Sequence, residues 1–343
     1  MNTIPRNPSG AKVGTITAEQ VIVAIPTLNE KAHIERCLRS LIDGEAFCAE
    51  VQFVVVDGGS TDRTREIVAE LSAHYNNIEL IHNPDKLQSA GINRVASECG
   101  RREHEILVRC DAHAAYPPGY IRRVVAAFET LPDAASVTGV LDARGNNCFQ
   151  KAAAWAVDTR LGSGGSGHRG GSVSKWVDHG HHAGFRLSWF QQLGGYDPTF
   201  SHNEDAEYDM RLTQAGGRVW LDHNLRVDYV MRPSWRKLFL QYWRYGKGRA
   251  RTCLKHNIRP GARQVIPTAA LILQIVSLIV GLVQPWALVV PALYLSALLA
   301  VSLAATAQLR SLCGLWAGAA LFAIHNAWAG GFIYSLARRR EPA

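Results

Sequence analysis

The first part of the chain alternates short apolar runs with longer amphipathic stretches. Residues 21–25, 51–56, 78–82 and 106–109 are rich in β-branched side chains and too short for helices, which is typical of buried strands. Stretches with helical spacing lie between them, at residues 30–42, 62–70 and 89–100. This alternation predicts an α/β fold built on a doubly wound parallel sheet.

The end of the chain has a different pattern, with apolar stretches at 265–283, 286–307 and 312–336. The first two are close to the roughly 20 residues that span a bilayer. A buried helix pair in a soluble protein is the alternative, but residues 265–336 contain Arg310 as their single charged side chain. We therefore expect two or three transmembrane helices.

The topology of the third stretch is less simple than that of the first two. His325 and Asn326 interrupt it, and a complete third span would carry Arg338, Arg339 and Arg340 across the membrane, against the positive-inside rule. A re-entrant or interfacial segment is the alternative. We favour three spans, because 25 residues without charge are costly to leave partly in water.

Charge is concentrated in one segment. The net charge is +8, yet the first 231 residues hold 23 Lys and Arg against 28 Asp and Glu, and ten cations without an acid lie between Arg232 and Arg263. Such a cluster beside apolar segments points to an anionic membrane surface or to phosphate groups. No nucleic-acid-binding motif accompanies it, so no nucleic-acid partner is expected.

The expected domains are a tail (1–20), a catalytic domain (21–231), a basic interfacial helical segment (232–264) and a membrane domain (265–343).

Seven cysteines, an odd number without CxxC spacing, favour reduced thiols in the cytosol. Residues 1–20 contain no apolar core suited to a signal peptide. Residues 162–171, "GSGGSGHRGG", are too rich in glycine for a regular element and are expected to form a mobile loop or lid.

Polar side chains follow the predicted strands. In "VVVDGGSTDRTREIV" the strand ends at Asp57 before two glycines, while Asn29 and Asp111 follow two other strands. Ligands of open parallel sheets bind at this edge, and glycine lets them approach the backbone. An ordinary turn capped by Ser60, Thr61 or Asp62 would give the same pattern for Asp57.

Asp111-Ala112-His113 is a candidate metal site. An Asp-x-His pair on an extended segment places both side chains on one side, where they can hold a divalent cation that bridges to a diphosphate. The imidazole shifts the preference from Mg²⁺ towards Mn²⁺.

A second acidic region contains Glu204, Asp205 and Asp209. Asp205 and Asp209 are four residues apart and could share one helix face. A solvated acidic helix start is one interpretation, since carboxylates are favoured there. The other is a general base that activates a hydroxyl nucleophile.

The residues alone leave the roles of two further groups open. Gln241, Arg244 and Tyr245 in "QYWRYGKGRA" either contact an anionic ligand or belong to an interfacial aromatic belt. His179, His181 and His182 could form a structural zinc cluster, but no cysteine partner lies nearby, which favours residues of a substrate-binding loop instead.

Together these residues resemble the family 2 inverting glycosyltransferases, which have the nucleotide-diphosphosugar (GT-A) fold. The resemblance covers about residues 20–250 and rests on one ordered set of motifs: Pro26, Asp57-Gly58-Gly59-Ser60-Thr61-Asp62, Asp111-Ala112-His113, Glu204-Asp205 and Gln241-x-x-Arg244-Tyr245. Within the family the chain is most similar to the succinoglycan-type exopolysaccharide glucosyltransferases, through "CDAHAAYPPGYI", "GHHAGFR", "WRYGKGRARTCLKHN" and the apolar tail.

The resemblance implies roles for these residues on the donor side and on the acceptor side. Asp57 would accept from the uracil N3–H of a UDP-sugar framed by Pro26 and Asn29, and Asp111 with His113 would hold Mn²⁺ or Mg²⁺ on the diphosphate. Asp205 would be the catalytic base. The remaining residues would contact the acceptor or a diphosphate: Glu204, His182, Arg186, Gln241, Arg244 and Tyr245. The family usually has a carboxylate where His113 stands and tryptophan where Tyr245 stands, so the ion and the acceptor contacts could differ here.

The implied activity is transfer of a sugar, expected to be glucose, to a polyprenyl-diphosphate-linked oligosaccharide in exopolysaccharide biosynthesis. The expected location is the inner membrane, with the catalytic domain facing the cytosol, and the expected partners are membrane lipids and other polysaccharide-assembly enzymes. A polyprenyl-phosphate sugar synthase would use the same nucleotide site. A catalytically silent membrane sensor of UDP-sugar is a third hypothesis, which the intact Glu204-Asp205 pair disfavours.

Overall fold

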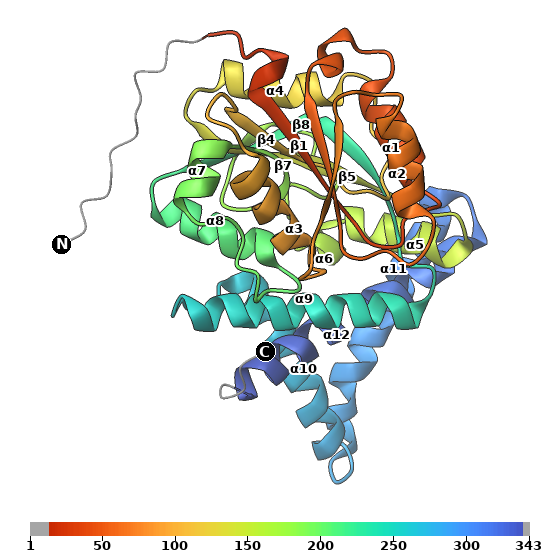
Figure 1. The fold of residues 1–343 in the computed structure, drawn as a ribbon. Coiled ribbons are helices and arrows are strands. Elements are labelled where there is room, and N and C mark those ends of the chain that lie inside the picture. Colours follow the sequence, from red (N-terminus) through yellow and green to blue (C-terminus); the bar gives the residue numbers. More distant parts are fainter. Residues whose placement is uncertain (1–13, 339–343) are drawn as a thin grey trace, which may run out of the picture. The chain divides into compact units, whose positions relative to one another are not determined.

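The computed structural model describes residues 14–338, and these residues form two units (Figure 1). The first unit holds the chain up to Leu141 together with Gly171–Asp228, and the second holds Asp142–Gly170 and the chain from Tyr229 onwards. The expected domain boundary at residue 231 lies close to the last point at which the chain passes from one unit to the other, after Asp228. Residues 142–170, which were expected in the catalytic domain, group with the C-terminal helices instead. Most of the tail expected at 1–20 lies outside the described residues, as do Arg339 and Arg340.

The first unit is built on an eight-stranded mixed sheet with the order β3-β2-β1-β4-β7-β5-β8-β6. Its strands are β1 (Val21–Thr27), β2 (Gln52–Asp57), β3 (Ile78–His82), β4 (Ile106–Arg109), β5 (Ala134–Arg144), β6 (Lys175–Val177), β7 (His181–Arg186) and β8 (Arg218–Val230). The four predicted strands are parallel neighbours, as expected. The other half of the sheet differs from the prediction, because β7 runs antiparallel to both β4 and β5 and β6 runs antiparallel to β8.

Helices of the first unit follow the predicted alternation. They are α1 (Ile34–Ile42), α2 (Thr64–Ser72), α3 (Gln88–Arg94), α4 (Tyr120–Thr130), α7 (Leu187–Gln192) and α8 (Glu204–Gln214), with short helical turns at Ala18–Gln20, Ala46–Ala49 and Val95–Cys99. The strands β1, β2 and β4 are buried on both faces, which explains their uninterrupted apolar sequences. One core cluster joins Ile22, Val54 and Leu107 of the sheet to Phe185 and Tyr208.

Strand direction places the polar residues of the loops at one edge of the sheet. Thr27 of β1 pairs with Asp57 of β2, so the two strands end side by side, and β4 ends shortly before Asp111. Because β7 is antiparallel to β4, it begins at this same edge, with His181. Residues from distant parts of the sequence therefore meet where ligands of such sheets bind.

The second unit consists of helices. They are α5 (Cys148–Asp158), α6 (Arg160–Ser163), α9 (Trp235–Lys255), α10 (Ala262–Val280), α11 (Val289–Leu309) and α12 (Ala317–Ala337), with short helical turns at Pro285–Leu288 and Leu312–Trp316. A core of Phe149, Leu238, Leu298, Leu321 and Ile324 joins α5, α9, α11 and α12. Within residues 14–338, three segments are long and apolar enough to cross a membrane: Ala262–Val280, Pro285–Leu309 and Leu312–Ala337.

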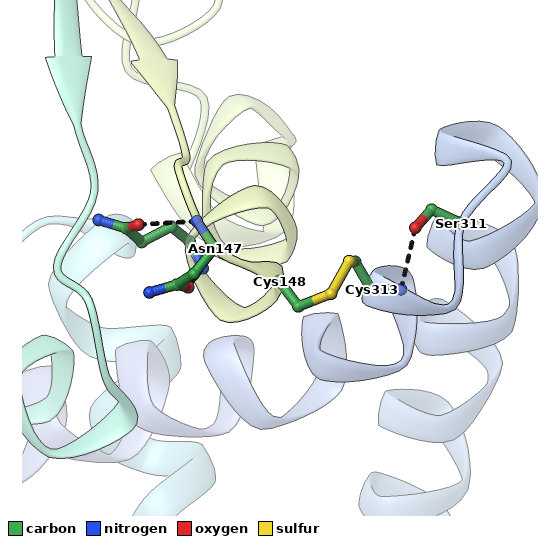
Figure 2. The surroundings of a disulfide bond; sticks show 5 residues. Asn147, Cys148, Ser311 and Cys313 are labelled. Atoms are coloured by element: carbon green, nitrogen blue, oxygen red, sulfur yellow. Dashed lines mark hydrogen bonds between the residues drawn. A yellow bond between two sulfur atoms is a disulfide. The ribbon is translucent and has the colours of Figure 1, made fainter.

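The expectation that all cysteines are reduced is wrong. Cys148 at the start of α5 forms a disulfide with Cys313 in the turn before α12, which Figure 2 shows. The two residues are 165 positions apart, and only the packing of α5 against this turn brings them together. Five cysteines remain free, at positions 37, 48, 99, 110 and 253. Because disulfides are rare in reducing compartments, the cysteines do not support a cytosolic location.

Candidate functional site

The loops after β1 and β2 are joined by side-chain hydrogen bonds. Asn29, which adopts a left-handed backbone conformation with φ 56°, accepts from the Thr61 N–H through Oδ1 (2.9 Å) and donates its own N–H to the Ser60 hydroxyl (2.8 Å). Asp62 accepts from the N–H groups of Lys31 (3.2 Å) and Thr64 (3.0 Å). The "DGGSTD" stretch is therefore held against the neighbouring loop before any ligand arrives.

Asp57 is buried and organises its own turn. Its Oδ2 accepts from the N–H groups of Gly59 and Ser60, both at 2.9 Å, and Oδ1 accepts from the Ser60 hydroxyl. Gly59 has φ 86°, a conformation that favours glycine. The turn interpretation of the pattern is thus correct in part, although Asp57 itself is the acceptor. A carboxylate has about four acceptor positions, so one on Oδ1 is left for a ligand.

A pocket of about 170 Å³ lies at this edge of the sheet. Pro26, Asp111 and His113 line it, as the sequence predicts for a shared site, and Asp57 and Asn29 are not among the lining residues. Three residues that the sequence did not single out complete its wall: Asn83, Lys86 and Gln88. Gln88 Nε2 donates to Asp111 Oδ1 (2.7 Å), which fixes one carboxylate oxygen at the pocket.

Arg109 connects the two acidic regions. It is the last residue of β4, its side chain is 5% exposed, and its guanidinium donates to the Tyr196 hydroxyl at 3.1 Å. Three carboxylates surround it at slightly longer range: Asp205 at 3.5 Å, Asp111 at 3.8 Å and Glu204 at 3.9 Å. A buried cation requires such compensation, so Arg109 draws Asp111 and the start of α8 to one place.

The arginine gives the paired acids opposite protonation states. Burial by itself would raise the pKa of Asp205, but Arg109, followed by His182 and His181, outweighs it and holds that pKa well below its usual range. For Glu204, burial and then the charge of Asp205 raise the pKa to about 8, against the opposing effect of Arg109. At neutral pH Asp205 is therefore ionised and Glu204 is protonated.

Asp111 is also kept ionised. Its burial favours the neutral form, but Arg109, then His181 and His113, lower the pKa below the ordinary value. His181 lies between the two acids, with Nε2 at 3.8 Å from Asp111 and Nδ1 at 4.0 Å from Asp205. A divalent cation and a proton acceptor both require ionised carboxylates, and the site supplies one for each.

A chain of buried hydrogen bonds connects Arg109 to Asp209. Asp209 accepts from His182 Nε2 (2.8 Å), His182 Nδ1 bonds the Tyr196 hydroxyl (2.7 Å), and Tyr196 contacts Arg109. Asp209 also accepts from His179 Nδ1 at 3.0 Å. Asp205 and Asp209 therefore have different environments, one facing the site and one within the core.

Two residues expected on the acceptor side take structural positions instead. His182 is buried, and both of its ring nitrogens are bonded within the chain described above. Arg186 lies at the far end of β7, opposite Ile106 at the start of β4, and donates to the carbonyl groups of Ala134 (3.0 Å) and Phe128 (3.0 Å). The antiparallel direction of β7, which the sequence did not reveal, carries Arg186 away from the site.

The residues at the pocket fit a divalent cation that is shared with a ligand. Asp111 and His113 both line the pocket, and Glu30 Oε1 lies 3.7 Å from His113 Nδ1. Within residues 14–338 no three His, Cys, Asp or Glu side chains are grouped so that they alone could hold an ion. One carboxylate plus an imidazole nevertheless suits an ion whose other ligands are diphosphate oxygens and water.

Gln241, Arg244 and Tyr245 lie on α9 in the second unit. The Gln241 amide is buried and hydrogen-bonds the hydroxyls of Tyr229 (2.6 Å) and Tyr245 (3.0 Å), whereas Arg244 is exposed. Arg169, from the glycine-rich stretch, stacks on the Tyr229 ring at 4.4 Å. Burial raises the pKa of Tyr245 well above its usual value, so the hydroxyl remains a hydrogen-bond donor.

Some of the site residues that were not predicted could have been recognised from the sequence, and others could not. Arg109 is a charged residue within the short apolar run "ILVRC", and such a residue needs a buried partner. Lys86 and Gln88 follow β3 in "HNPDKLQ", the one predicted strand whose end was not considered. Tyr196 had no local signal, because its role depends on a contact with Arg109, 87 residues away.

Comparison with known proteins places the chain in a family. The model of "Glycosyl transferase family 2" matches residues 22–194. The succinoglycan biosynthesis protein ExoA of Rhizobium meliloti (strain 1021) is 39% identical over 92% of this chain and 95% of that protein. The dolichyl N-acetyl-alpha-D-glucosaminyl phosphate 3-beta-D-2,3-diacetamido-2,3-dideoxy-beta-D-glucuronosyltransferase of Methanococcus voltae is 24% identical over 66% of this chain and 71% of its own length.

A solved structure has the same fold. The mannosyltransferase PcManGT from Pyrobaculum calidifontis, in complex with GDP-Man and Mn²⁺, superposes with a TM-score of 0.54 at 21% identity, covering 90% of this chain and 87% of that one. The fold agrees with the GT-A architecture expected from the motifs. On the family match and the identity to the Rhizobium protein, this chain belongs to glycosyl transferase family 2.

Proposed function

We propose that this protein is an inverting glycosyltransferase that moves a sugar, expected to be glucose, from a UDP-sugar to a polyprenyl-diphosphate-linked oligosaccharide during exopolysaccharide biosynthesis. The observation that carries the proposal is the shared contact of two ionised carboxylates, Asp111 in the donor pocket and Asp205 at the start of α8, with the buried Arg109. One can serve the diphosphate while the other serves the acceptor. The similarity to a succinoglycan biosynthesis protein supports the exopolysaccharide role.

The donor would bind at the β1, β2 and β4 ends. We place the uridine against Pro26 and the loop held by Asn29, with the free acceptor position of Asp57 Oδ1 directed to the uracil N3–H. Lys86, at the pocket wall, is available for phosphate oxygens. Asp111 and His113 would hold Mn²⁺ or Mg²⁺, and such an ion neutralises charge on a departing diphosphate.

Asp205 would act as the base. The acceptor hydroxyl oxygen forms a bond to the anomeric carbon, the bond from that carbon to the UDP oxygen breaks with its electron pair leaving on UDP, and the hydroxyl proton passes to Asp205. A single displacement of this kind inverts the anomeric configuration. Glu204 is already protonated at neutral pH, so it is poorly suited to accept this proton.

The acceptor would be bound by the second unit at the membrane. Its residues 229–338 contain no Asp or Glu, whereas α9 alone carries seven Lys and Arg, which suits the binding of an anionic ligand. We assign Gln241, Arg244 and Tyr245 to the lipid-linked diphosphate or its sugars. We propose that the catalytic unit faces the cytosol at the inner membrane, which the UDP-sugar supply and the cations next to the first apolar helix support, whereas the Cys148–Cys313 disulfide does not.

The test is transfer by purified protein in lipid from a panel of labelled UDP-sugars to two acceptors. One acceptor is a polyprenyl-diphosphate-linked oligosaccharide and the other is polyprenyl monophosphate. We expect one UDP-hexose to label the oligosaccharide, with inverted configuration at the new linkage. Labelling of the monophosphate alone would replace the proposal by the synthase function, and UDP-sugar binding without transfer to either acceptor would leave the sensor hypothesis.

A further inference from the structure

The last apolar helix, α12, lies alongside the basic helix α9 rather than standing apart from it (Figure 1). Near their starts, Trp235 Nε1 donates to the Ala319 carbonyl at 3.0 Å. Near their ends, Phe332 of α12 packs in one cluster with Ala250 and Cys253 of α9. The two helices therefore run side by side in the same direction over 21 residues each, which corresponds to about 32 Å.

Glycines bring the two backbones together along this pair. A Cβ atom on Gly246 of α9 would stand 2.0 Å from the carbonyl oxygen of Trp328, and one on Gly331 of α12 would stand 2.1 Å from the carbonyl oxygen of Trp243. Side chains also join the helices, with Trp243 packed on Tyr334 and Lys247 Nζ 5.5 Å above the Tyr334 ring. Such close packing fixes the direction of α12 to that of α9.

The direction of α9 is restricted by its charges. Seven cations are spread from its first turn to its last: Arg236, Lys237, Arg244, Lys247, Arg249, Arg251 and Lys255. If α9 crossed the bilayer, several of these would lie within the hydrocarbon, where cations are costly. In the plane of the membrane, the same cations face phosphate headgroups.

The three apolar helices differ in how much surface they leave for lipid. Only 6% of the Ala262–Val280 span and 17% of the Pro285–Leu309 span is buried, compared with 56% of Leu312–Ala337. The polar residues of α12 also have protein partners, since His325 Nε2 donates to the Leu161 carbonyl at 2.9 Å and Asn326 lies 3.4 Å from the Tyr294 hydroxyl. Helices α10 and α11 thus have lipid-facing surfaces, whereas α12 is covered largely by its neighbours.

We propose that α9 and α12 lie flat on an anionic bilayer surface as one paired platform, and that only the α10–α11 hairpin crosses the membrane. The exposed cations Arg236 and Lys237 then contact lipid phosphates. The chain leaves α12 on the side where α9 lies, so Arg338 stays on that side and the positive-inside rule is satisfied without translocating it. This differs from the three-span topology that the sequence favours, and it does not depend on the proposed glycosyl transfer.

Cysteine labelling in spheroplasts of the expressing cells tests the proposal on the full chain. Three single variants report on three places: Glu70→Cys on the exposed surface of the first unit, Val283→Cys at the α10–α11 turn and Ala337→Cys at the end of α12. A membrane-impermeant maleimide is added before or after lysis, and the unsubstituted protein gives the background from the native cysteines. We expect Val283→Cys to react in intact spheroplasts, and Glu70→Cys and Ala337→Cys to react only after lysis.

The decisive result is whether Ala337→Cys reacts on the same side of the membrane as Glu70→Cys or as Val283→Cys. If it reacts together with Val283→Cys and opposite to Glu70→Cys, α12 crosses the membrane and the proposal is overturned. If Val283→Cys shares the side of Glu70→Cys, the hairpin does not cross and the proposal also fails. Retained sugar transfer by a variant shows that the variant is folded. If neither the variants nor the unsubstituted protein transferred sugar, that result would contradict the proposed function but not the proposed topology.

Discussion

The two units differ in how many acids accompany their arginine and lysine side chains. In the first unit Arg109 is buried and three carboxylates surround it, and less buried arginines such as Arg39, Arg94 and Arg122 also have acidic partners. In the second unit the described residues include sixteen Lys and Arg, but only two acids, Asp142 and Asp158. The first unit therefore has acids to pair with its cations, whereas the second unit carries a large excess of cations over acids.

This difference matches a division of labour in the proposed reaction. Internal compensation fixes the positions and protonation states of Asp111 and Asp205 before substrate binds, as electrostatic catalysis requires. An excess of cations over acids suits a surface that meets phosphate, whether in lipid headgroups or in a lipid-linked diphosphate. Each of the following changes tests one side of this comparison.

Removal of divalent cations is expected to have the largest effect, because it leaves Asp111 and His113 without the ion that would face the donor diphosphate. Chelation should abolish transfer, and Mn²⁺ should restore it at least as well as Mg²⁺. His113→Asp, which supplies a carboxylate in place of the imidazole, should shift the balance towards Mg²⁺. Initial rates across metal concentrations measure this, and undiminished transfer in chelator would refute a metal-dependent mechanism.

Loss of the central arginine comes next. Arg109→Met leaves Asp111, Glu204 and Asp205 around an uncharged side chain, and breaking a buried charge pair lowers the free energy of unfolding by about 3–5 kcal/mol. Arg122→Met is the matched control, because Arg122 bonds Glu129 at a more exposed site and surface pairs contribute about 0–1 kcal/mol. Denaturant unfolding compares the two variants, and equal losses would mean that Arg109 does not organise the site.

Much of the fold followed from local patterns, as the parallel half of the sheet illustrates. Four strands and their intervening helices were recognised because periodicity and the polar residues at strand ends are local features. The antiparallel half was not predicted, since pairing such as that of β7 with both β4 and β5 is set by contacts between distant residues. For this reason Arg186 was placed in the site, although it lies at the opposite end of its strand.

The candidate site shows the same limit. Pro26, Asp111 and His113 were expected in one pocket because strand ends meet at one edge, and they do line it together. The role of Arg109 depends on α8 returning to β4 across nearly a hundred residues, which no spacing rule reveals. The Cys148–Cys313 disulfide was missed for the same reason.

Charge removal on α9 is expected to have a smaller effect. Arg236→Gln and Lys237→Gln should each weaken attraction to anionic lipid by about 1 kcal/mol, or roughly fivefold in the lipid concentration that gives half-maximal activity in mixed micelles. Lys31→Gln, an exposed cation of the first unit, is the control and should leave this concentration unchanged. High salt should remove the difference. An equal shift in the control would show that α9 has no special contact with lipid.

The smallest expected effect concerns the protonated acid of the pair. Because the pKa of Glu204 is raised to about 8 in the folded protein, its contribution to stability is complete below the unfolded value near 4.5 and is lost as pH rises towards 8. Glu204→Gln cannot ionise, so its melting temperature should fall less between pH 5 and pH 8.5 than that of the unsubstituted protein. Glu70→Gln, on an exposed helix, should keep the original slope, and an unchanged slope in Glu204→Gln would contradict the assigned protonation state.

The most direct test of the central claim is the rate of sugar transfer by Asp205→Asn, measured together with its affinity for UDP. If Asp205 is the ionised base held by Arg109, the amide cannot take the acceptor proton, and turnover should fall by roughly 10²–10⁴-fold while UDP binding stays nearly unchanged. Glu204→Gln, next to it on the same helix turn, should lose much less. Transfer by Asp205→Asn at close to the original rate would contradict the account.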